Sequence, residues 1–235
     1  MAEVAGDSPL QSRALESLSS VVNYQAWLTE LALPYLGDHP IEFGSGIGDY
    51  AQRWLDLGVP EITVSELDPS RLAHLQSRFE HNERVRVREI DVTKPAGDGY
   101  SSLVAFNVLE HIADDVAALR GARALVQPGG HVIVFVPAFE FAFGRFDRQV
   151  GHVRRYRLQT LRDRFKQAGL TVDDLRYVNA PGLLSWFVGV RLLRMHVTDG
   201  ALVRAWDRSI TPAARRLESR VRPPFGQSLL AVGRV

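Results

Sequence analysis

From residue 41 to residue 49 the chain reads IEFGSGIGD, a short apolar run followed by three glycines at alternate positions. Glycines in such a loop let the backbone turn sharply and approach a ligand closely. The residues after the loop have helical spacing, with apolar side chains at Ala51, Trp54 and Leu55. The stretch therefore predicts a strand, a glycine-rich loop and a helix, the arrangement with which an α/β sheet binds a nucleoside cofactor.

An acidic residue lies where a ribose-binding group is expected. Glu66 closes the next apolar run, about 20 residues after the first glycine of the loop, the spacing at which an acidic side chain meets a ribose diol. Asp68 competes for this role, but it precedes Pro69 and is explained as the N-cap of a helix. Glu66 has no helix to cap, so we predict that it binds the ribose of an adenosine-type cofactor.

A nicotinamide dinucleotide site would require a different loop. Its Gly-x-Gly-x-x-Gly pattern has a third glycine that permits close helix packing, and Asp49 occupies that position here. The Asp49 carboxylate would also lie near a pyrophosphate. The loop therefore favours a cofactor without phosphates over the cofactor of a nicotinamide oxidoreductase.

Short apolar runs alternate with segments of helical spacing along most of the chain. We predict strands over Ile41–Phe43, Ile62–Val64, Val85–Ile90, Ser102–Phe106, Val132–Val136, Thr171–Asn179 and Gln227–Val235. We predict helices over Val21–Leu36, after the glycine loop, and over Pro69–Phe79, Ile112–Val126 and Leu158–Ala168. Such alternation predicts an α/β fold with a mostly parallel sheet.

A chain of 235 residues is short enough to form one α/β domain. We divide it into N-terminal cap helices (1–38), a cofactor-binding core (39–180), an arginine-rich helical insertion (181–226) and a last strand (227–235). An insertion of this length is expected to be a lid over the site or an oligomer face. Residues 181–226 are therefore the candidate interface of a homodimer.

Composition argues against several classes of protein. The formal net charge of +1 argues against an obligate nucleic-acid binder, and the absence of cysteine removes disulfides, thiolate metal sites and cysteine nucleophiles. The longest largely apolar stretch, Ala180–Val190, is shorter than the roughly 20 residues of a membrane span. Residues Met1–Ser20 lack the order of a signal peptide, so we expect a cytoplasmic protein.

The loop and its neighbours resemble the class I S-adenosylmethionine-dependent methyltransferases over about residues 20 to 180. Glu42 and the three glycines match the family's acidic-x-Gly-x-Gly-x-Gly loop, and Pro128-Gly129-Gly130 matches the turn before its fifth strand. The resemblance implies a Rossmann-like three-layer sandwich, with a mostly parallel seven-stranded sheet and an antiparallel C-terminal strand. It implies S-adenosylmethionine as cofactor, S-adenosylhomocysteine as product, and a cofactor site formed by Tyr24, Glu42, Gly44, Gly46, Gly48, Glu66, Leu67, Asp91, Val92 and Asn107.

A narrower resemblance lies between residues 146 and 156, which read FDRQVGHVRRY. This segment is similar to an Asp…Gly-His-x-Arg-Arg-Tyr signature in bacterial members often associated with sugar or glycoconjugate modification, and Asn23-Tyr24-x-x-Trp27 resembles the same subgroup. The resemblance implies a small-molecule or oligosaccharide acceptor. It also implies that Tyr24 closes over the cofactor, for which a tyrosine packed in the core is the alternative.

Four residues of this segment are candidates for binding the acceptor. Arg154 and Arg155 beside Tyr156 can grip an anionic or polyhydroxylated molecule, because guanidinium presents a rigid fork of donors. We add Asp147 to this set. A solvated arginine face is the alternative interpretation.

Methyl transfer to a hydroxyl needs a base, because a hydroxyl is a poor nucleophile until its proton leaves. His152 is the first candidate, since it follows a glycine in the loop after the fifth strand, where an α/β sheet places ligands. His111, which opens a helix after the fourth strand, ranks next, and Glu110 is third. Each has a structural alternative: His152 held by Asp147 or Glu140, His111 bonded to backbone, and Glu110 placed at the positive end of that helix.

Asn107, Glu110 and His111 resemble the Glu-x-x-Glu-His arrangement by which some family members hold Mg²⁺. Asn107 replaces the first carboxylate, and its amide oxygen carries no charge. Mg²⁺ usually depends on carboxylates and substrate oxygens. We therefore do not expect a required Mg²⁺.

These observations favour an O-methyltransferase that acts on a hydroxyl of a sugar or a sugar-containing small molecule. Two alternatives remain open from the sequence. One is N-methylation of an amino sugar or another amine, which needs little beyond positioning of the acceptor. The other is S-adenosylmethionine binding without transfer, as in a sensor or interaction module.

Overall fold

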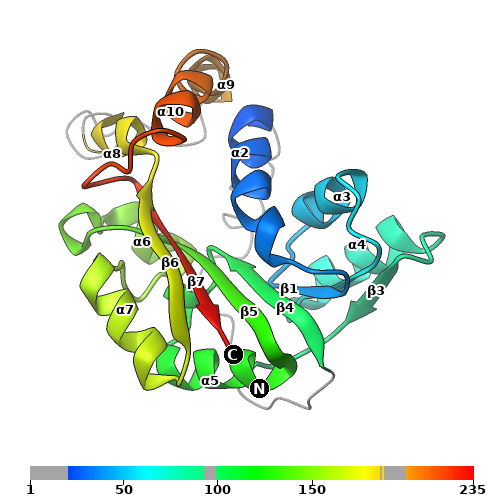
Figure 1. Cartoon of the computed structure of the whole chain (residues 1–235). Coiled ribbons are helices and arrows are strands. Elements are labelled where there is room, and N and C mark those ends of the chain that lie inside the picture. Colours follow the sequence, from blue (N-terminus) through cyan, green and yellow to red (C-terminus); the bar gives the residue numbers. More distant parts are fainter. Residues whose placement is uncertain (1–20, 93–98, 186, 188–199) are drawn as a thin grey trace.

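The computed structural model describes residues 21–92, 99–185, 187 and 200–235. Within these residues the strands form one seven-stranded sheet in the order β3-β2-β1-β4-β5-β7-β6 (Figure 1). The strands are β1 (Pro40–Phe43), β2 (Ile62–Ser65), β3 (Val85–Arg88), β4 (Tyr100–Phe106), β5 (Val126–Pro137), β6 (Thr171–Val178) and β7 (Ser228–Arg234). Each predicted run thus coincides with a strand.

Pairing in the sheet is parallel except where β7 takes part. β1 pairs in parallel with β2 and β4, and β4 pairs in parallel with β5, whereas β7 runs antiparallel to β5 and β6. Parallel neighbours need a crossover connection, usually a helix, and this explains why strand and helix periods alternate in the sequence. The predicted Rossmann-like α/β fold with an antiparallel C-terminal strand is confirmed.

Helices cover both faces of this sheet. They are α2 (Val22–Ala32), α3 (Asp49–Asp56), α4 (Pro69–Phe79), α5 (Asp115–Leu125), α6 (Arg145–Val150), α7 (Leu158–Gln167), α8 (Ala180–Ser185), α9 (Gly200–Ser209) and α10 (Thr211–Glu218). Short 3₁₀ turns occupy Leu33–Tyr35, Leu109–His111 and Glu140–Ala142. Side chains of α5 and α7 pack in one apolar cluster, and side chains of α2, α3 and α4 pack in another.

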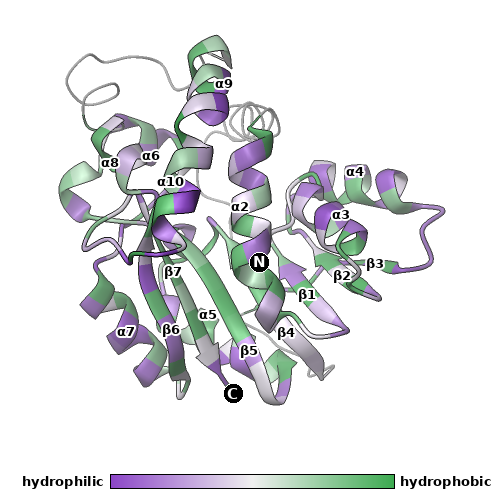
Figure 2. Cartoon of the chain, turned by 45° about the horizontal axis from the view of Figure 1, so that its top comes forward, coloured by the Kyte–Doolittle hydropathy of each residue, from purple (hydrophilic) through white to green (hydrophobic). Residues whose placement is uncertain are grey.

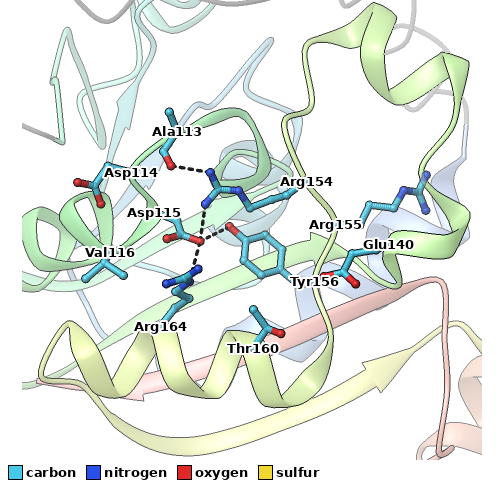
Figure 3. Close-up of a pocket in the computed structure, with 10 residues that line it drawn as sticks. All are labelled: Ala113, Asp114, Asp115, Val116, Glu140, Arg154, Arg155, Tyr156, Thr160 and Arg164. Atoms are coloured by element: carbon cyan, nitrogen blue, oxygen red, sulfur yellow. Dashed lines mark hydrogen bonds and ion pairs between the residues drawn. The ribbon is translucent and has the colours of Figure 1, made fainter.

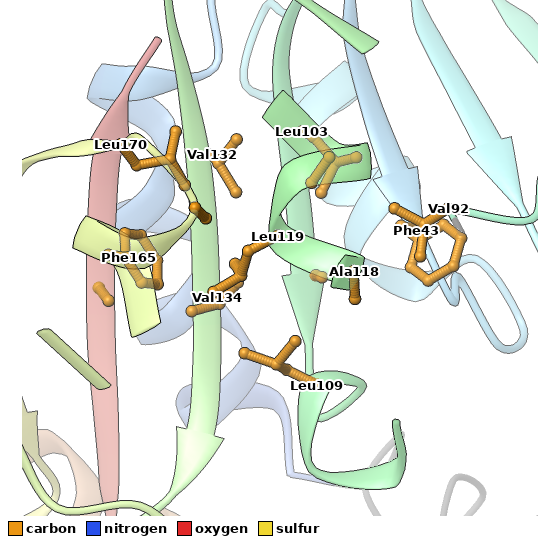
Figure 4. Close-up of a cluster of buried hydrophobic side chains, with 14 of the residues drawn as sticks. Phe43, Val92, Leu103, Leu109, Ala118, Leu119, Val132, Val134, Phe165 and Leu170 are labelled. Carbon is orange, nitrogen blue, oxygen red and sulfur yellow. The ribbon is translucent and has the colours of Figure 1, made fainter. Parts of the chain in front are cut away.

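The central strands contribute alternate side chains to these two clusters. On β5, Val132 and Val134 face the cluster of α5 and α7, whereas Ile133 and Phe135 face the cluster of α2 and α3. Figure 4 shows the first cluster, in which Phe165 of α7 lies near β5. Burial on both faces explains the continuous apolar run at residues 132–136 of β5, and Figure 2 shows this part of the strand as hydrophobic.

Several helix boundaries differ from the sequence prediction. The helix predicted over Val21–Leu36 ends at Ala32, because the chain continues as the 3₁₀ turn Leu33–Tyr35. Asp68 accepts hydrogen bonds from backbone N–H groups in the first turn of α4, so its predicted N-cap role is confirmed. α5 begins later than predicted, at Asp115, because Asp114 caps it. Ile112 therefore lies before the helix and not within it.

The turn predicted at Pro128-Gly129-Gly130 belongs to β5 in the structure, so the predicted boundary was wrong. β5 begins at Val126, which pairs with Tyr100, and the register shifts before the next pair. The Gly129 N–H donates to the Val235 carbonyl, and the Val235 N–H donates back to Gly130. These backbone hydrogen bonds join the glycines to the C-terminal end of the sheet.

Helices α2, α8, α9 and α10 gather at one end of the sheet (Figures 1 and 2). Glu218 of α10 accepts hydrogen bonds from the N–H groups of Asn179 and Ala180, directly after β6. Asp207 of α9 accepts from the N–H groups of Asn23 and Tyr24, in the first turn of α2. These contacts tie the insertion to the carboxyl end of the sheet.

In the part of the chain that the structure describes, every helix is too short or too polar to cross a membrane. The Met1–Ser20 segment, examined above for a signal peptide, lies outside the described residues. So do residue 186 and residues 188–199, which include part of the apolar stretch and of the arginine-rich insertion.

Replacing Asp207 by alanine should destabilise the protein. The change leaves partly buried N–H groups at the start of α2 without their acceptor, which costs about 1–2 kcal/mol and lowers the melting temperature by roughly 2–8 °C. Thermal unfolding followed by circular dichroism measures the shift. Arg208→Ala, an exposed change on the same helix, is the control; equal melting of the two variants would contradict the capping role.

Candidate active site

The order of the strands reverses between β1 and β4, and open α/β sheets bind ligands outside the carboxyl ends of the strands at such a point. The glycine-rich loop follows β1 there, with positive φ angles at Gly44 (69°), Gly46 (57°) and Gly48 (83°). A Cβ atom at Gly44 would lie 2.6 Å from a methyl group of Val108. The loop therefore packs directly on the segment after β4, and only glycine permits this approach.

Glu66, at the end of β2, holds the loop in position. Its Oε2 accepts a hydrogen bond from the Gly46 N–H at 3.1 Å, and its Oε1 accepts from the N–H groups of Leu67 and Asp68 at 2.9 and 3.1 Å. The Arg71 guanidinium lies 3.4 Å from the same Oε2 atom. A buried carboxylate thus lies directly beside the loop, where the sequence analysis expects the ribose-binding acid.

Glu42 is a buried carboxyl group two residues before the loop. Its side chain is only 3% exposed, and its Oε2 has no hydrogen-bond partner among the described residues. Burial raises the pKa of Glu42 to about 8. Leaving an acceptor buried and unpaired costs free energy, so this atom marks a place where a ligand that donates a hydrogen bond or carries positive charge is favoured.

The remaining predicted cofactor residues follow strands at the same edge of the sheet. Leu67 follows β2, and Asp91 and Val92 follow β3. Asn107 follows β4 with an exposed side chain and a φ angle of 55°, a conformation that is uncommon outside glycine and that often occurs at functional sites. The topology therefore brings these residues to one edge, although their contacts with a cofactor stay a prediction.

Tyr24 of α2 lies between its helix and the ends of β6 and β7. Burial raises the pKa of its hydroxyl group to about 12, and the side chains of Ser228 and Asn179 act against this rise. Its ring meets Trp27 edge-on, with 6.4 Å between the ring centroids. These contacts agree with the alternative of a packed tyrosine, and a role in closing over the cofactor stays a prediction.

His152 is oriented by a buried ion pair. Asp147 of α6 is fully buried and forms two hydrogen bonds with the Arg155 guanidinium, of 2.8 and 3.1 Å. Burial opposes ionisation of Asp147, but hydrogen bonds from His152 and Arg155 outweigh it and hold the pKa of this carboxyl below its usual range. An ionised Asp147 can only accept, so the His152 Nδ1–H donates to it at 2.8 Å and Nε2 carries the lone pair of the neutral ring.

The three predicted catalytic residues, His152, Glu110 and His111, lie together in the structure. The His152 Nε2 atom lies 3.8 Å from Oε1 of Glu110, and the rings of His152 and His111 meet edge-on with 4.7 Å between their centroids. Burial raises the pKa of Glu110 to about 7. Burial, together with the neighbouring His152, lowers the pKa of His111 to about 4, so this ring is neutral at pH 7.

Two features of this cluster differ from the sequence prediction. His111 does not open a helix: it ends the 3₁₀ turn Leu109–His111, because Asp114 caps α5 only after it. The side chain that lies with Glu110 and His111 is that of His152. The sequence resemblance had grouped Asn107 with these two residues as possible metal ligands. The N–H of Val153 donates to the Glu110 carbonyl and holds the two segments together.

Arg154, Arg155 and Tyr156 line an open cavity of about 660 Å³, drawn in Figure 3. Their polar groups nevertheless have partners within the chain. Tyr156 is fully buried and donates to Asp115 at 3.0 Å, and Arg154 forms an ion pair with the same carboxylate at 2.7 Å. Arg155, Tyr156 and Asp147 are thus buried and paired within the chain, and direct binding of an acceptor by these residues stays a prediction.

Sequence reasoning missed Asp115, on which this cavity depends. Its buried carboxylate accepts a hydrogen bond from Tyr156 and forms ion pairs with Arg154 and Arg164, the latter at 3.4 Å. Figure 3 shows the three side chains converging on it. The available signal was the pair of adjacent acidic residues at the start of α5. Asp114 alone caps α5, so the carboxylate of Asp115 is available for another role.

The pH dependence of stability should report on Glu42. Its carboxyl is protonated in the folded protein up to about pH 8 but ionises near pH 4.5 when unfolded, so the free energy of unfolding falls between these values, by up to about 1.4 kcal/mol per pH unit. Glu42→Gln removes this term. The melting temperature of the variant should therefore rise above that of the unmodified protein increasingly from about pH 5 to about pH 8. Exposed Glu83→Gln is the control, and a pH-independent difference for Glu42→Gln would refute the assignment.

Comparison with known proteins gives a family match over the core of the chain. Residues 41–132 match a family model described as a methyltransferase domain. The ubiquinone biosynthesis O-methyltransferase of Xanthomonas campestris pv. campestris is 28% identical over 130 residues, which are 53% of this chain and 52% of that protein. The hybrid PKS-NRPS synthetase apdA of Emericella nidulans is 27% identical over 117 residues, 46% of this chain and 3% of the synthetase. The chain thus spans about half or much less of the length of these relatives.

Solved structures of the same fold cover most of the chain. An S-adenosylmethionine-dependent methyltransferase from Mesorhizobium loti superimposes with a TM-score of 0.61 at 13% identity, covering 88% of this chain and 96% of that one. The cyclase SpnF gives the same TM-score at 19% identity, covering 88% of this chain and 80% of its own. The fold is therefore shared by proteins whose names indicate different reactions. Residues 41–132 thus resemble a methyltransferase domain, and the whole described chain has the fold that structures of S-adenosylmethionine-dependent methyltransferases share.

Proposed function

We propose that the protein transfers a methyl group from S-adenosylmethionine to a hydroxyl of a sugar or a sugar-containing small molecule. One observation carries the proposal: the oriented His152 lies beside Glu110 and His111, on segments that follow β4 and β5. This is a set of proton acceptors at the edge of the sheet that carries the glycine-rich loop. A hydroxyl acceptor needs such a set, whereas an amine does not.

The residues of the loop fit the proposed cofactor. The loop glycines leave the main chain open to a nucleoside, and in this proposal the Glu66 carboxylate beside them accepts from the ribose. The Oε2 atom of Glu42, which has no hydrogen-bond partner among the described residues, leaves a hydrogen-bonding position beside the loop for a ligand. S-adenosylmethionine supplies a methyl group that its sulfonium already activates, so the protein has mainly to position the acceptor and exclude water.

His152 is the proton acceptor in this proposal, and Asp147 is its positioning residue. Asp147 fixes the tautomer of His152 in which Nε2 carries a lone pair. Arg155 neutralises the charge of the buried Asp147 carboxylate. As the acceptor oxygen forms its bond to the methyl carbon, the bond from that carbon to sulfur breaks, S-adenosylhomocysteine leaves, and the hydroxyl proton passes to Nε2. Glu110, 3.8 Å away, stabilises the imidazolium that results.

Two further observations support the acceptor class. The Gly-His-x-Arg-Arg-Tyr segment that resembles a sugar-modifying subgroup is the segment that builds the His152 environment and lines the 660 Å³ cavity. The Xanthomonas relative is named as an O-methyltransferase. In the same proposal α9 and α10, with α2, form a lid, and residues 181–226 provide the surface of a homodimer.

Cofactor binding is the first test of the proposal. Isothermal titration calorimetry should register heat with S-adenosylhomocysteine, and the ligand should raise the melting temperature. Glu66→Gln should weaken binding about tenfold or more, because a hydrogen bond to a charged acceptor is lost. The exposed change Glu83→Gln should have no effect. Absence of heat at millimolar ligand, with Glu66→Gln behaving like the unmodified protein, would overturn the assignment.

Turnover is the second test. Labelled S-adenosylmethionine with an extract of the source organism, followed by mass spectrometry, identifies the methylated acceptor. With that acceptor, His152→Gln should lower kcat about 10²–10⁴-fold while the affinity for S-adenosylhomocysteine stays within a few-fold. His131→Gln, which removes a histidine paired with Asp173 elsewhere, should leave kcat unchanged. Full turnover by His152→Gln, or a label found on nitrogen, would refute O-methylation through this residue.

A further inference from the structure

The side chains of Glu110, His111 and His152 can converge on a single point. Each offers one ligand atom, and these three atoms all lie within 4.8 Å of one another. Ligands around a tetrahedral ion with bonds of about 2.1 Å would be about 3.4 Å apart. Small rotations of the side chains therefore suffice to bring the three atoms into one coordination sphere.

The His152 ring is held in the manner of a metal ligand. It donates through Nδ1 to Asp147, which leaves Nε2 for a ligand. Histidines that bind metals almost always donate their second ring nitrogen to a carboxylate or a backbone carbonyl, which fixes the tautomer and the ring orientation. The buried Asp147 carboxylate is such an outer partner for His152.

Glu110 would be the third ligand, and its carboxylate points to a bound cation independently of the two histidines. Its side chain is fully buried, and neither carboxylate oxygen has a hydrogen-bond partner among the described residues. Nearby Asp147, in contrast, is fully paired with Arg155 and His152. A buried carboxylate without donors is costly unless something else compensates it, and a cation between the carboxylate and two imidazoles would do so.

We propose that Glu110, His111 and His152 form a binding site for one divalent transition-metal ion, with acceptor oxygens completing its coordination. Two imidazole nitrogens and one carboxylate suit Zn²⁺, Co²⁺, Fe²⁺ or Mn²⁺, whereas Mg²⁺ prefers oxygen ligands alone. Three protein ligands leave open positions, as in catalytic and not in structural sites. The role of the ion rests on the proposed function, but its binding does not.

An ion at this site would change how the hydroxyl is activated. With the ion bound, the Nε2 lone pair of His152 would be used for coordination, so proton transfer to His152 would be confined to the metal-free protein. A hydroxyl bound to the ion becomes more acidic, and its proton leaves to solvent as the oxygen forms its bond to the methyl carbon. Asp147 keeps the same positioning role in both descriptions.

Titration of the metal-free full chain with Co²⁺ tests the site without requiring activity. Binding should produce a visible d–d absorption band that saturates at one ion per chain. Zn²⁺ should abolish the band by competition, and millimolar Mg²⁺ should not, as ligand type and the order of divalent affinities require. The melting temperature should rise with saturating Zn²⁺.

Variants separate the site from adventitious binding at other histidines. Glu110→Gln should lose at least tenfold in Co²⁺ affinity yet melt no lower than the unmodified protein, because it removes an unpaired buried carboxylate. Asp147→Asn, outside the coordination sphere, should weaken Co²⁺ binding about 10–100-fold. His131→Gln, the matched histidine–carboxylate pair at the surface, should bind Co²⁺ normally.

Three results decide the proposal. An absent band, or a band that Glu110→Gln and His152→Gln leave unchanged while both variants stay folded, overturns the metal site. Loss of the band in these variants and its retention in His131→Gln supports it. S-adenosylhomocysteine binding measured with a chelator present is a separate readout, so failure of cofactor binding with an intact Co²⁺ band refutes the proposed function and not the metal site.

Discussion

Parallel pairing at the centre of the sheet sets Glu42 of β1 opposite Val104 of β4, and the position of every candidate site residue depends on it. Because both strands end at the same edge, the glycine-rich loop after β1 meets the segment after β4, which carries Asn107 and Glu110. A Cβ atom at Gly44 would overlap Val108, so the loop can be this close only without a side chain there. The strand order reverses at this pair, which leaves room for a ligand beyond the strand ends.

Charge is distributed unevenly around that ligand position. Asp147 is buried but fully compensated by Arg155 and His152, so it costs little and orients the histidine. Glu42 and Glu110 are as deeply buried, and each keeps at least one oxygen unpaired. Burial raises the pKa of both groups. Perturbed carboxyl groups of this kind cluster at functional sites, because the rest of the fold must compensate for their cost.

Polar contacts join α9 and α10 to the rest of the fold, in addition to the apolar side chain of Ala214, which packs in the cluster of α2 and α3. Asp207 of α9 accepts from the backbone at the start of α2, and Glu218 of α10 accepts from the backbone that follows β6. Single hydrogen bonds contribute about 1 kcal/mol each, so each of these contacts makes a modest contribution to the attachment.

The sequence alone determined the strands, most helix boundaries and the glycine loop with its acidic partner, because periodicity, capping and glycine geometry act over a few neighbouring residues. It also named Glu110, His111 and His152 as candidates, but as three separate ones. Only the tertiary structure placed them in one cluster and turned Arg155 and Tyr156 inward, because contacts across about 40 residues depend on how β4, β5 and the segment around α6 pack. Asp115 escaped notice for the same reason: its partners come from the distant loop before α7 and from α7 itself.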